Sequence, residues 1–271
     1  MSVKQEAAEL NSKMRKTIPL VHSITNYVTV NDCANALLAI GASPIMADDL
    51  LEAADITAIS KALVINIGTL NQRTVEAMVL AGKRANELDI PVVLDPVGAG
   101  ASKLRNETVK KILEQVKITI LRGNLSEVSY VAGLSASTKG VDASEADSRR
   151  DAGSVAVSAA ERLSCTVAVT GAVDVITDGK RRVKIFNGHP MLSKVTGTGC
   201  MTSAITGGYA AVKEDPFTAA AAGVMSMGIA GEIAFEKSGV LGTGSFRIAL
   251  MDALSNLDEQ TIKEMGKIEE E

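Results

Sequence analysis

The stretch that decides the fold runs from Ala62 to Gly100 and reads ALVINIGTLNQRTVEAMVLAGKRANELDIPVVLDPVGAG. Two short apolar runs, Ala62–Asn66 and Val92–Leu94, have the length and β-branched content of strands. Between them, Arg73–Leu88 is long enough for a helix, with one face that holds Val75, Met78, Val79 and Gly82. A helix between two strands forms a parallel crossover, which is almost always right-handed.

The same alternation extends on both sides of this unit. Further strands are predicted at Leu20–Ser23, Ser43–Met46, Ile118–Leu121, Thr166–Thr170, Asp174–Thr177 and Val183–Phe186. Helices are predicted at Asn31–Ile40, Asn106–Gln115, Leu125–Ala132 and Ser148–Leu163, and the charged N-terminal segment also has a helical pattern. Because several strands are continuously apolar, we expect helices on both faces of a mostly parallel sheet, which makes this an α/β protein.

The pattern changes toward the C-terminus. The Asp178-Gly179 turn between the last two predicted strands indicates an antiparallel hairpin at the sheet edge. Beyond Gly197 the sequence predicts only helices, and the charged tail IKEMGKIEEE is expected to be a solvated helix end. Since no proline-rich linker or repeat interrupts the chain, we expect a single domain over residues 1–271.

Composition excludes several classes of protein. The chain has 271 residues, 46% of them hydrophobic and 3% aromatic, and a net charge of −4. It therefore lacks the basic surface and the stacking side chains of a nucleic-acid-binding protein. The apolar run Phe217–Gly231 is too short to span a membrane and is expected to be a buried helix, so we expect no membrane partner. No signal peptide is visible, and Cys33, Cys165 and Cys200 form no metal motif, so we expect a cytoplasmic protein with at least two buried cysteines.

Polar and glycine-rich segments follow five of the predicted strands. They are His22–Asn26, Asn66–Thr69, Asp95–Gly100, Arg122–Asn124 and Thr170–Gly171. Ligands of parallel α/β sheets bind outside the carboxyl ends of the strands, so we expect these segments to line one cleft. Because turns favour the same residue types, a single segment of this kind would be weak evidence for a binding cleft.

The segment Val195–Thr202, VTGTGCMT, places glycines at the start of a long helix. Main-chain N–H groups at a helix N-terminus bind anions such as phosphate, which makes this segment a candidate anion site. It is neither a Walker A loop nor a dinucleotide-binding fingerprint, because neither spacing occurs in the chain. The alternative is a flexible connection that precedes a packed helix.

Two carboxylates are candidates for holding Mg²⁺. Asp95 ends a buried strand, and Glu127 opens a predicted helix three residues after Asn124. Mg²⁺ is usually bound by one or two carboxylates together with water and substrate phosphates. The alternative for Glu127 is the N3 position of a capping box with Asn124 at the N-cap, and Asp95 before Pro96 could simply form a turn.

Cys200 lies in the first turn of the helix behind the glycines, where the helix dipole lowers the pKa of a thiol. A hydroxyl substrate held there would hydrogen-bond to the sulfur. The alternative is a small residue that fits a crowded helix start. His22 and His189 are expected to be structural or loop residues rather than catalytic ones.

Together these segments resemble, in order, those of the hydroxyethylthiazole kinases. The resemblance is carried by PLVHSITN at 19–26, GASPIMA at 41–47, NIGTL at 66–70, DPVGAGA at 95–101, RGN at 122–124 with Glu127, and VTGTGC at 195–200. It covers the chain from about residue 18 to GTGSF at 242–246. Single pieces, such as Asn-x-x-Glu and Gly-Thr-Gly, mark only the wider ribokinase-like superfamily.

The resemblance implies a ribokinase-like three-layer α/β/α sandwich. It also implies the ATP-dependent phosphorylation of the primary alcohol of 4-methyl-5-(2-hydroxyethyl)thiazole, a step of thiamine salvage, by a homotrimer with active sites between neighbouring subunits. The residues carried over are Arg122, Thr170, Asn124 and Gly199 for ATP; Met46, Gly197, Asn26 and Gly68 for the thiazole; Asp95 and Glu127 for Mg²⁺; and Cys200 as the catalytic residue.

One position departs from the wider superfamily, which carries Asp as the catalytic base where this chain has Cys200. Our hypothesis is that Cys200 orients the alcohol and accepts its proton late, because phosphoryl transfer depends mainly on alignment and charge stabilisation. A hydroxymethylpyrimidine or pyridoxal kinase, or a nucleotide-dependent repair dehydratase, would normally have that Asp. A non-catalytic binding protein is a third alternative, against which the combination of Asp95, Glu127 and the glycine segment argues.

Overall fold

A computed structural model describes residues 1–134, 151–212 and 215–271, so the predicted helix start at 148–150 lies outside the described residues. Nine strands form one sheet: β1 (Leu20–Ile24), β2 (Ser43–Ile45), β3 (Ala62–Asn66), β4 (Val92–Asp95), β5 (Ile120–Asn124), β6 (Thr166–Thr170), β7 (Asp174–Thr177), β8 (Arg182–Ile185) and β9 (Ile268–Glu270). Their order is β2-β1-β3-β4-β5-β6-β7-β8-β9. The strands from β2 to β6 are parallel, whereas β7, β8 and β9 pair antiparallel, which confirms the mostly parallel sheet with an antiparallel edge hairpin.

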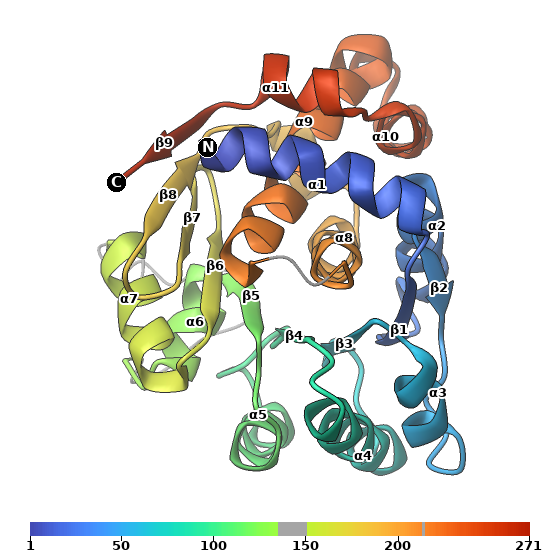
Figure 1. The fold of residues 1–271 in the computed structure, drawn as a ribbon, viewed down its shortest axis with the longest axis vertical. Coiled ribbons are helices and arrows are strands. Elements are labelled where there is room, and N and C mark those ends of the chain that lie inside the picture. The colour runs from blue at the N-terminus through green and yellow to red at the C-terminus, as the bar shows by residue number, and fades with distance from the viewer. Residues whose placement is uncertain (135–150, 213–214) are drawn as a thin grey trace.

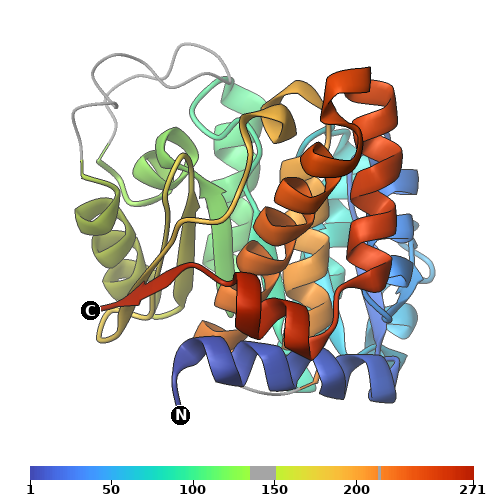
Figure 2. The ribbon, with the colours of Figure 1, turned by 90° about the horizontal axis from the view of Figure 1, so that it is seen from above.

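Helices cover both faces of the sheet (Figure 1). On one face lie α3 (Ala53–Ile59), α4 (Gln72–Glu87), α5 (Lys103–Gln115), α6 (Leu125–Val131) and α7 (Ala152–Leu163). On the other lie α1 (Val3–Thr17), α2 (Val30–Ala39), α8 (Thr198–Ala210) and α9 (Pro216–Ser238), with α10 (Thr243–Asn256) and α11 (Glu259–Met265) packed outside α9. Figure 2 shows α8, α9 and α10 side by side. The predicted three-layer α/β/α sandwich is confirmed.

Each face of the sheet has its own apolar core, and small residues allow the helices to approach closely. All five residues of β3 are buried, as expected for a strand covered on both faces. Gly207 of α8 packs directly on this strand, since a Cβ added there would lie 2.3 Å from Cγ2 of Val64. The expectation that the apolar run Phe217–Gly231 is too short to span a membrane is wrong, because the helix that contains it, α9, has the length and composition of a span. Its burial is as predicted, since most of its residues lie in the core.

Three sequence predictions need correction. Helix α3 was not predicted, and β5 begins at Ile120 and continues through Asn124, so Arg122 lies within the strand rather than after it. The charged tail forms α11 and then β9 instead of a helix end. Strand β9 pairs antiparallel with β8, and Glu271, the residue after β9, forms ion pairs with both Arg182 and Lys184 of β8.

Candidate active site

Side chains from the ends of three strands join α8 through a chain of hydrogen bonds. Nδ2 of Asn26, after β1, donates to Oδ1 of Asn66 at 3.0 Å and to Sγ of Cys200 at 3.3 Å. Asn66 ends β3 and donates from Nδ2 to Oδ2 of Asp95 at 2.8 Å. The same oxygen accepts a hydrogen bond of 2.8 Å from Oγ of Ser203, one turn beyond Cys200. Asn26, Asp95 and Cys200, predicted separately, therefore belong to one cluster.

Asp95, at the end of β4, is the buried charge at the centre of this cluster. Burial raises the pKa of this carboxyl to about 7, opposed by the guanidinium of Arg122 and reinforced by the nearby Glu127. Nη1 of Arg122 lies 3.8 Å from Oδ2 of Asp95. The other oxygen, Oδ1, is buried and has no hydrogen-bond partner among the described residues. Since buried carboxylate oxygens are rarely left unpartnered, this atom fits the ligand of a cation.

Glu127 has the predicted capping role as well as a place near Asp95. Its Oε2 accepts from the main-chain N–H of Asn124 at 2.8 Å, and Oδ1 of Asn124 accepts from that of Glu127 at 2.9 Å, which completes the capping box of α6. Its Oε1 accepts from the N–H of Gly98 at 2.8 Å, which joins the loop after β4 to this helix. Among the described residues no three His, Cys, Asp or Glu side chains form a metal cluster, so that part of the chain offers Mg²⁺ at most this pair of carboxylates.

The start of α8 presents free main-chain N–H groups. Its N-cap is Gly197, in the left-handed region at φ 86°, and no side chain caps the helix. A Cβ at Gly197 would lie 2.6 Å from Cγ2 of Thr29, and one at Gly199 would lie 2.8 Å from Nη1 of Arg122. The two glycines thus allow the helix start to fit against α2 and allow a guanidinium to approach the same N–H groups. A helix N-terminus combined with an Arg is a site for an anion.

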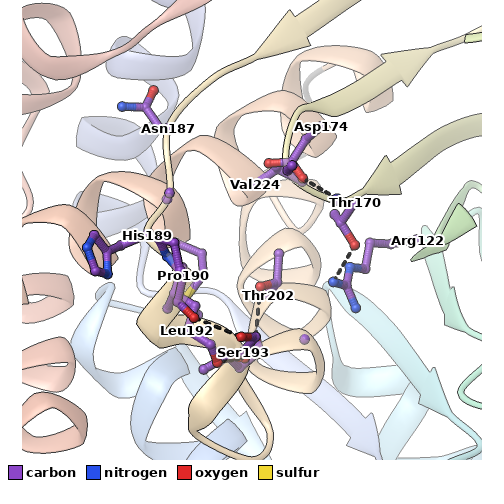
Figure 3. A pocket seen from close by; sticks show the side chains of 17 residues that line it. Arg122, Thr170, Asp174, Asn187, His189, Pro190, Leu192, Ser193, Thr202 and Val224 are labelled. Carbon is purple, nitrogen blue, oxygen red and sulfur yellow. Dashed lines mark hydrogen bonds between the residues drawn. The ribbon is translucent and has the colours of Figure 1, made fainter. Parts of the chain in front are cut away.

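A cavity of about 530 Å³ opens beside this helix start (Figure 3). Arg122, Thr170 and Asp174 lie on one wall, and His189 and Pro190 lie on the other. Nη2 of Arg122 donates a hydrogen bond of 2.6 Å to Oγ1 of Thr170, so these two predicted residues act together. Thr198 and Gly199 of α8 also line this cavity.

A second cavity, of about 200 Å³, shares no lining residue with the first. It is lined at the ends of β1, β2 and β3 by Ser23, Thr25, Tyr27, Met46 and Thr69, among others. Met46 therefore lines a different cavity from Arg122, Thr170 and Gly199, while Gly68 precedes Thr69 in the chain and donates its N–H to Oδ1 of Asn66 at 2.9 Å. Thr69 of this cavity accepts a hydrogen bond of 3.2 Å from the N–H of Tyr27, and the preceding Asn26 donates to Asn66 and to Cys200 at the start of α8.

The thiol of Cys200 corrects one expectation. Burial, followed by the charge of Asp95, raises its pKa above the ordinary value, although the residue lies at a helix N-terminus. Cys33 and Cys165 are buried, as predicted, and burial raises the pKa of each to about 12.

Both histidines have structural partners, as predicted. His22 is buried, with Nδ1 2.8 Å from Oγ1 of Thr57 and Nε2 2.7 Å from the carbonyl oxygen of Ala47. His189 accepts from the N–H of Met191, and its ring stacks on Phe235 at 3.6 Å. His189 nevertheless lines the larger cavity, a position that the sequence did not indicate.

Arg105 of α5 is a further residue that sequence reasoning missed. Its Nη1 donates to the carbonyl oxygen of Ile67 at 2.7 Å and to that of Val97, and its Nη2 donates to that of Gly68 at 2.7 Å. One guanidinium therefore holds together the loops after β3 and β4, which carry Gly68 and Gly98. Its three acceptors are main-chain carbonyls, which leave no signal in a sequence.

Comparison with known proteins identifies the family of this chain. The sequence profile of the hydroxyethylthiazole kinase family matches residues 11–260. The relative named hydroxyethylthiazole kinase from Ruminiclostridium cellulolyticum is 63% identical over 267 residues, 98% of either chain, and that from Clostridium beijerinckii is 62% identical over 264 residues, 96% of either chain.

Solved structures place the fold in the same group. The hydroxyethylthiazole kinase protein from Pyrococcus horikoshii OT3 superposes with a TM-score of 0.89 at 41% identity, covering 98% of this chain and 99% of that chain. The pyridoxal kinase from Staphylococcus aureus in complex with AMP-PCP has a TM-score of 0.60 at 15% identity over 80% of this chain and 89% of that chain, a likeness of the ribokinase-like fold alone. The chain belongs to the hydroxyethylthiazole kinase family.

Proposed function

We propose that this cleft is the site at which the chain, as a hydroxyethylthiazole kinase, transfers the terminal phosphoryl group of ATP to the alcohol of 4-methyl-5-(2-hydroxyethyl)thiazole in thiamine salvage. The nucleotide occupies the larger cavity, and the thiazole alcohol approaches from the smaller one. The observation that carries this assignment is the hydrogen-bonded chain from Asp95 through Asn66 and Asn26 to Cys200, which connects the acidic and thiol groups beside the start of α8.

The phosphates of ATP are assigned to the N–H groups of α8 and to Arg122. An Arg and a helix N-terminus both stabilise negative charge, and phosphoryl transfer is catalysed mainly by such positioning and stabilisation. Thr170 holds Arg122 in place, and Gly199 leaves the space that the guanidinium occupies. Asn124 contributes by capping α6, which fixes Glu127 at the edge of the site.

Asp95 and Glu127 are the residues that would hold Mg²⁺, which when bound neutralises phosphate charge. The unpartnered Oδ1 of Asp95 supports this assignment. Asn66 and Ser203 keep the carboxylate of Asp95 oriented from its other oxygen, Oδ2.

The thiazole alcohol is assigned to Met46, Gly68, Asn26 and Gly197, with Cys200 facing its hydroxyl group. Because the pKa of Cys200 is raised, the thiol stays protonated at neutral pH and aligns the alcohol instead of acting as a strong base. A weak base suffices in phosphoryl transfer, since the transition state is largely dissociative.

The assembly, location and domain organisation are also part of this proposal. We propose a homotrimer in which a neighbouring subunit covers the smaller cavity, supported by the exposed apolar side chains of Tyr27, Val28 and Leu51 at that end of the sheet. The buried free cysteines support a cytoplasmic location. The single continuous sheet supports one domain over residues 1–271.

The experiment is a steady-state assay of phosphoryl transfer from ATP with a substrate panel. We expect phosphorylated thiazole alcohol, and a kcat/KM for hydroxymethylpyrimidine and pyridoxal lower by about 100-fold or more. Arg122→Met should raise the KM for ATP at least about tenfold, whereas the surface control Arg84→Met, which breaks an exposed pair with Glu87, should not. ATP consumption without a phosphorylated thiazole product would contradict the proposal.

A further inference from the structure

Asp174 is a buried carboxylate in the wall of the larger cavity that the reaction described above does not use. It begins β7, four residues after Thr170, and is only 8% exposed. Its Oδ1 accepts a hydrogen bond of 2.8 Å from the N–H of Gly171. Its Oδ2 accepts none from the part of the chain that the structure describes, and it lies beside the open space of the cavity (Figure 3).

The other end of the same hairpin shows what a purely structural aspartate looks like here. Oδ1 of Asp178 accepts from the N–H groups of Lys180 and Arg181, and its Oδ2 accepts from Nε of Arg181. Both of its oxygens are thus satisfied within the turn. Asp174 needs only one oxygen to close its own turn, and the second remains available to a ligand.

Most polar side chains around the cavity already have hydrogen-bond partners within the protein, which limits the groups that can bind a ligand. Thr202 and Ser193 donate their hydroxyl protons to nearby carbonyl oxygens, and the amide of Asn187 is fully used by Glu232, Met265 and Lys267. Asp174 therefore offers an acceptor oxygen to which no other side chain of the described lining donates a hydrogen bond, although the charge of the nearby Arg122 opposes the burial that raises the pKa of this carboxyl. A carboxylate repels phosphate, so its partner must be a hydrogen-bond donor on the nucleoside part of the nucleotide.

We propose that Asp174 recognises the ribose of the nucleotide, with Oδ2 accepting a hydrogen bond from a ribose hydroxyl group. This inference rests on the proposed placement of ATP in the larger cavity. Because Arg122 and Gly199 hold the phosphates, the ribose comes next along the nucleotide, beside the wall that continues from Thr170 to Asp174. The kinase should therefore prefer ribonucleotides to deoxyribonucleotides.

The test compares kcat/KM for ATP, 2′-deoxy-ATP, 3′-deoxy-ATP and ITP at a saturating concentration of thiazole alcohol. A hydrogen bond to a charged group predicts that the wild type prefers ATP to at least one deoxy analogue by about tenfold or more. Asp174→Ala should reduce this preference to less than about threefold, mainly through the KM for ATP, and leave the KM for the thiazole alcohol unchanged. Asp174→Asn keeps the hydrogen bond to Gly171 and should also reduce the preference for ATP over the deoxy analogue. This second variant tests the role of Asp174 if the Ala variant does not fold.

Asp178→Asn is the matched control, since it alters an aspartate of the same hairpin away from the cavity, and it should keep the wild-type preference. An unchanged ribose preference in both Asp174 variants overturns the inference, as does a change confined to the ratio of ATP to ITP, which would place the contact on the base. If Arg122→Met leaves the KM for ATP unchanged, the placement of the nucleotide itself is wrong. If it raises that KM while the ribose preference of the Asp174 variants persists, only the role of Asp174 fails.

Discussion

At the scale of single residues, the side chains of the site are oriented by hydrogen bonds to one another. Asn66 makes three hydrogen bonds that fix its neighbours. Its Oδ1 accepts from Asn26 and from the N–H of Gly68, and this orientation directs its Nδ2 to Asp95. Asn26 then donates to Cys200 with its remaining N–H. The thiol and the carboxylate are thus fixed relative to each other by two amides.

Cys200 gives the first prediction at this scale. Cys200→Ser should lower kcat by about tenfold and leave the KM for ATP unchanged, because the shorter Cβ–Oγ bond and the smaller atom move the side-chain group that aligns the alcohol out of position. Cys200→Asp should increase turnover, because a carboxylate is a stronger base. Single-turnover measurement of thiazole phosphate formation checks both variants, and the role of Cys200 fails if the Ser variant loses no turnover and the Asp variant gains none.

Asp174 gives a prediction for stability against pH. Burial raises the pKa of this carboxyl from 3.8 to about 6, so the folded state holds its proton more tightly than the unfolded chain does. Stability therefore falls as pH rises from about 4 to about 6, and above that the charged form carries the full penalty. Asp174→Asn removes the penalty and should stabilise the protein at pH 8 by on the order of 1–3 kcal/mol, but not at pH 4. Urea unfolding at both pH values checks this, and an equal effect at both would contradict it.

At the scale of secondary-structure elements, α5 and the C-terminal segment shape the site from outside it. Arg105 of α5 binds the loops after β3 and β4. The end of α11 and the segment that follows it support the larger cavity, because the N–H of Lys267 donates to Oδ1 of Asn187 at 2.7 Å and Nδ2 of Asn187 donates to the carbonyl oxygen of Met265 at 2.9 Å. Neither element was expected to contribute to the site.

Arg105 gives the prediction at this scale. Arg105→Met should raise the KM for the thiazole alcohol by about tenfold and lower the melting temperature by several degrees, because three carbonyl groups lose a charged donor. Arg105→Lys should recover only part of this effect, since one ammonium cannot reproduce the planar fork of a guanidinium. Thermal unfolding and kinetics check both, with Arg84→Met as the surface control; a full recovery by the Lys variant would contradict the argument.

At the scale of the whole molecule, hydrophobic pattern and strand-end chemistry predicted most of the sheet and the residues around Asp95. The apolar runs of β3 and β4 are unambiguous, and parallel strands deliver their polar ends to one edge. Strand β9 was missed because its sequence, IEE, has no strand pattern of its own and is a strand only by its pairing with β8. The roles of Arg105 and Asp174 depend on main-chain contacts and burial, which a sequence pattern does not encode.

The central claim is that the N-terminus of α8 and Arg122 hold the terminal phosphates while the alcohol approaches from the side of Cys200. A crystal structure with a non-hydrolysable ATP analogue and the thiazole alcohol tests it most directly. The account predicts the γ-phosphate within hydrogen-bond distance of the N–H groups at Gly199 and Cys200, with the hydroxyl oxygen in line and facing the thiol. A triphosphate bound away from this helix start, with Asp95 and Glu127 far from its phosphates, would contradict it.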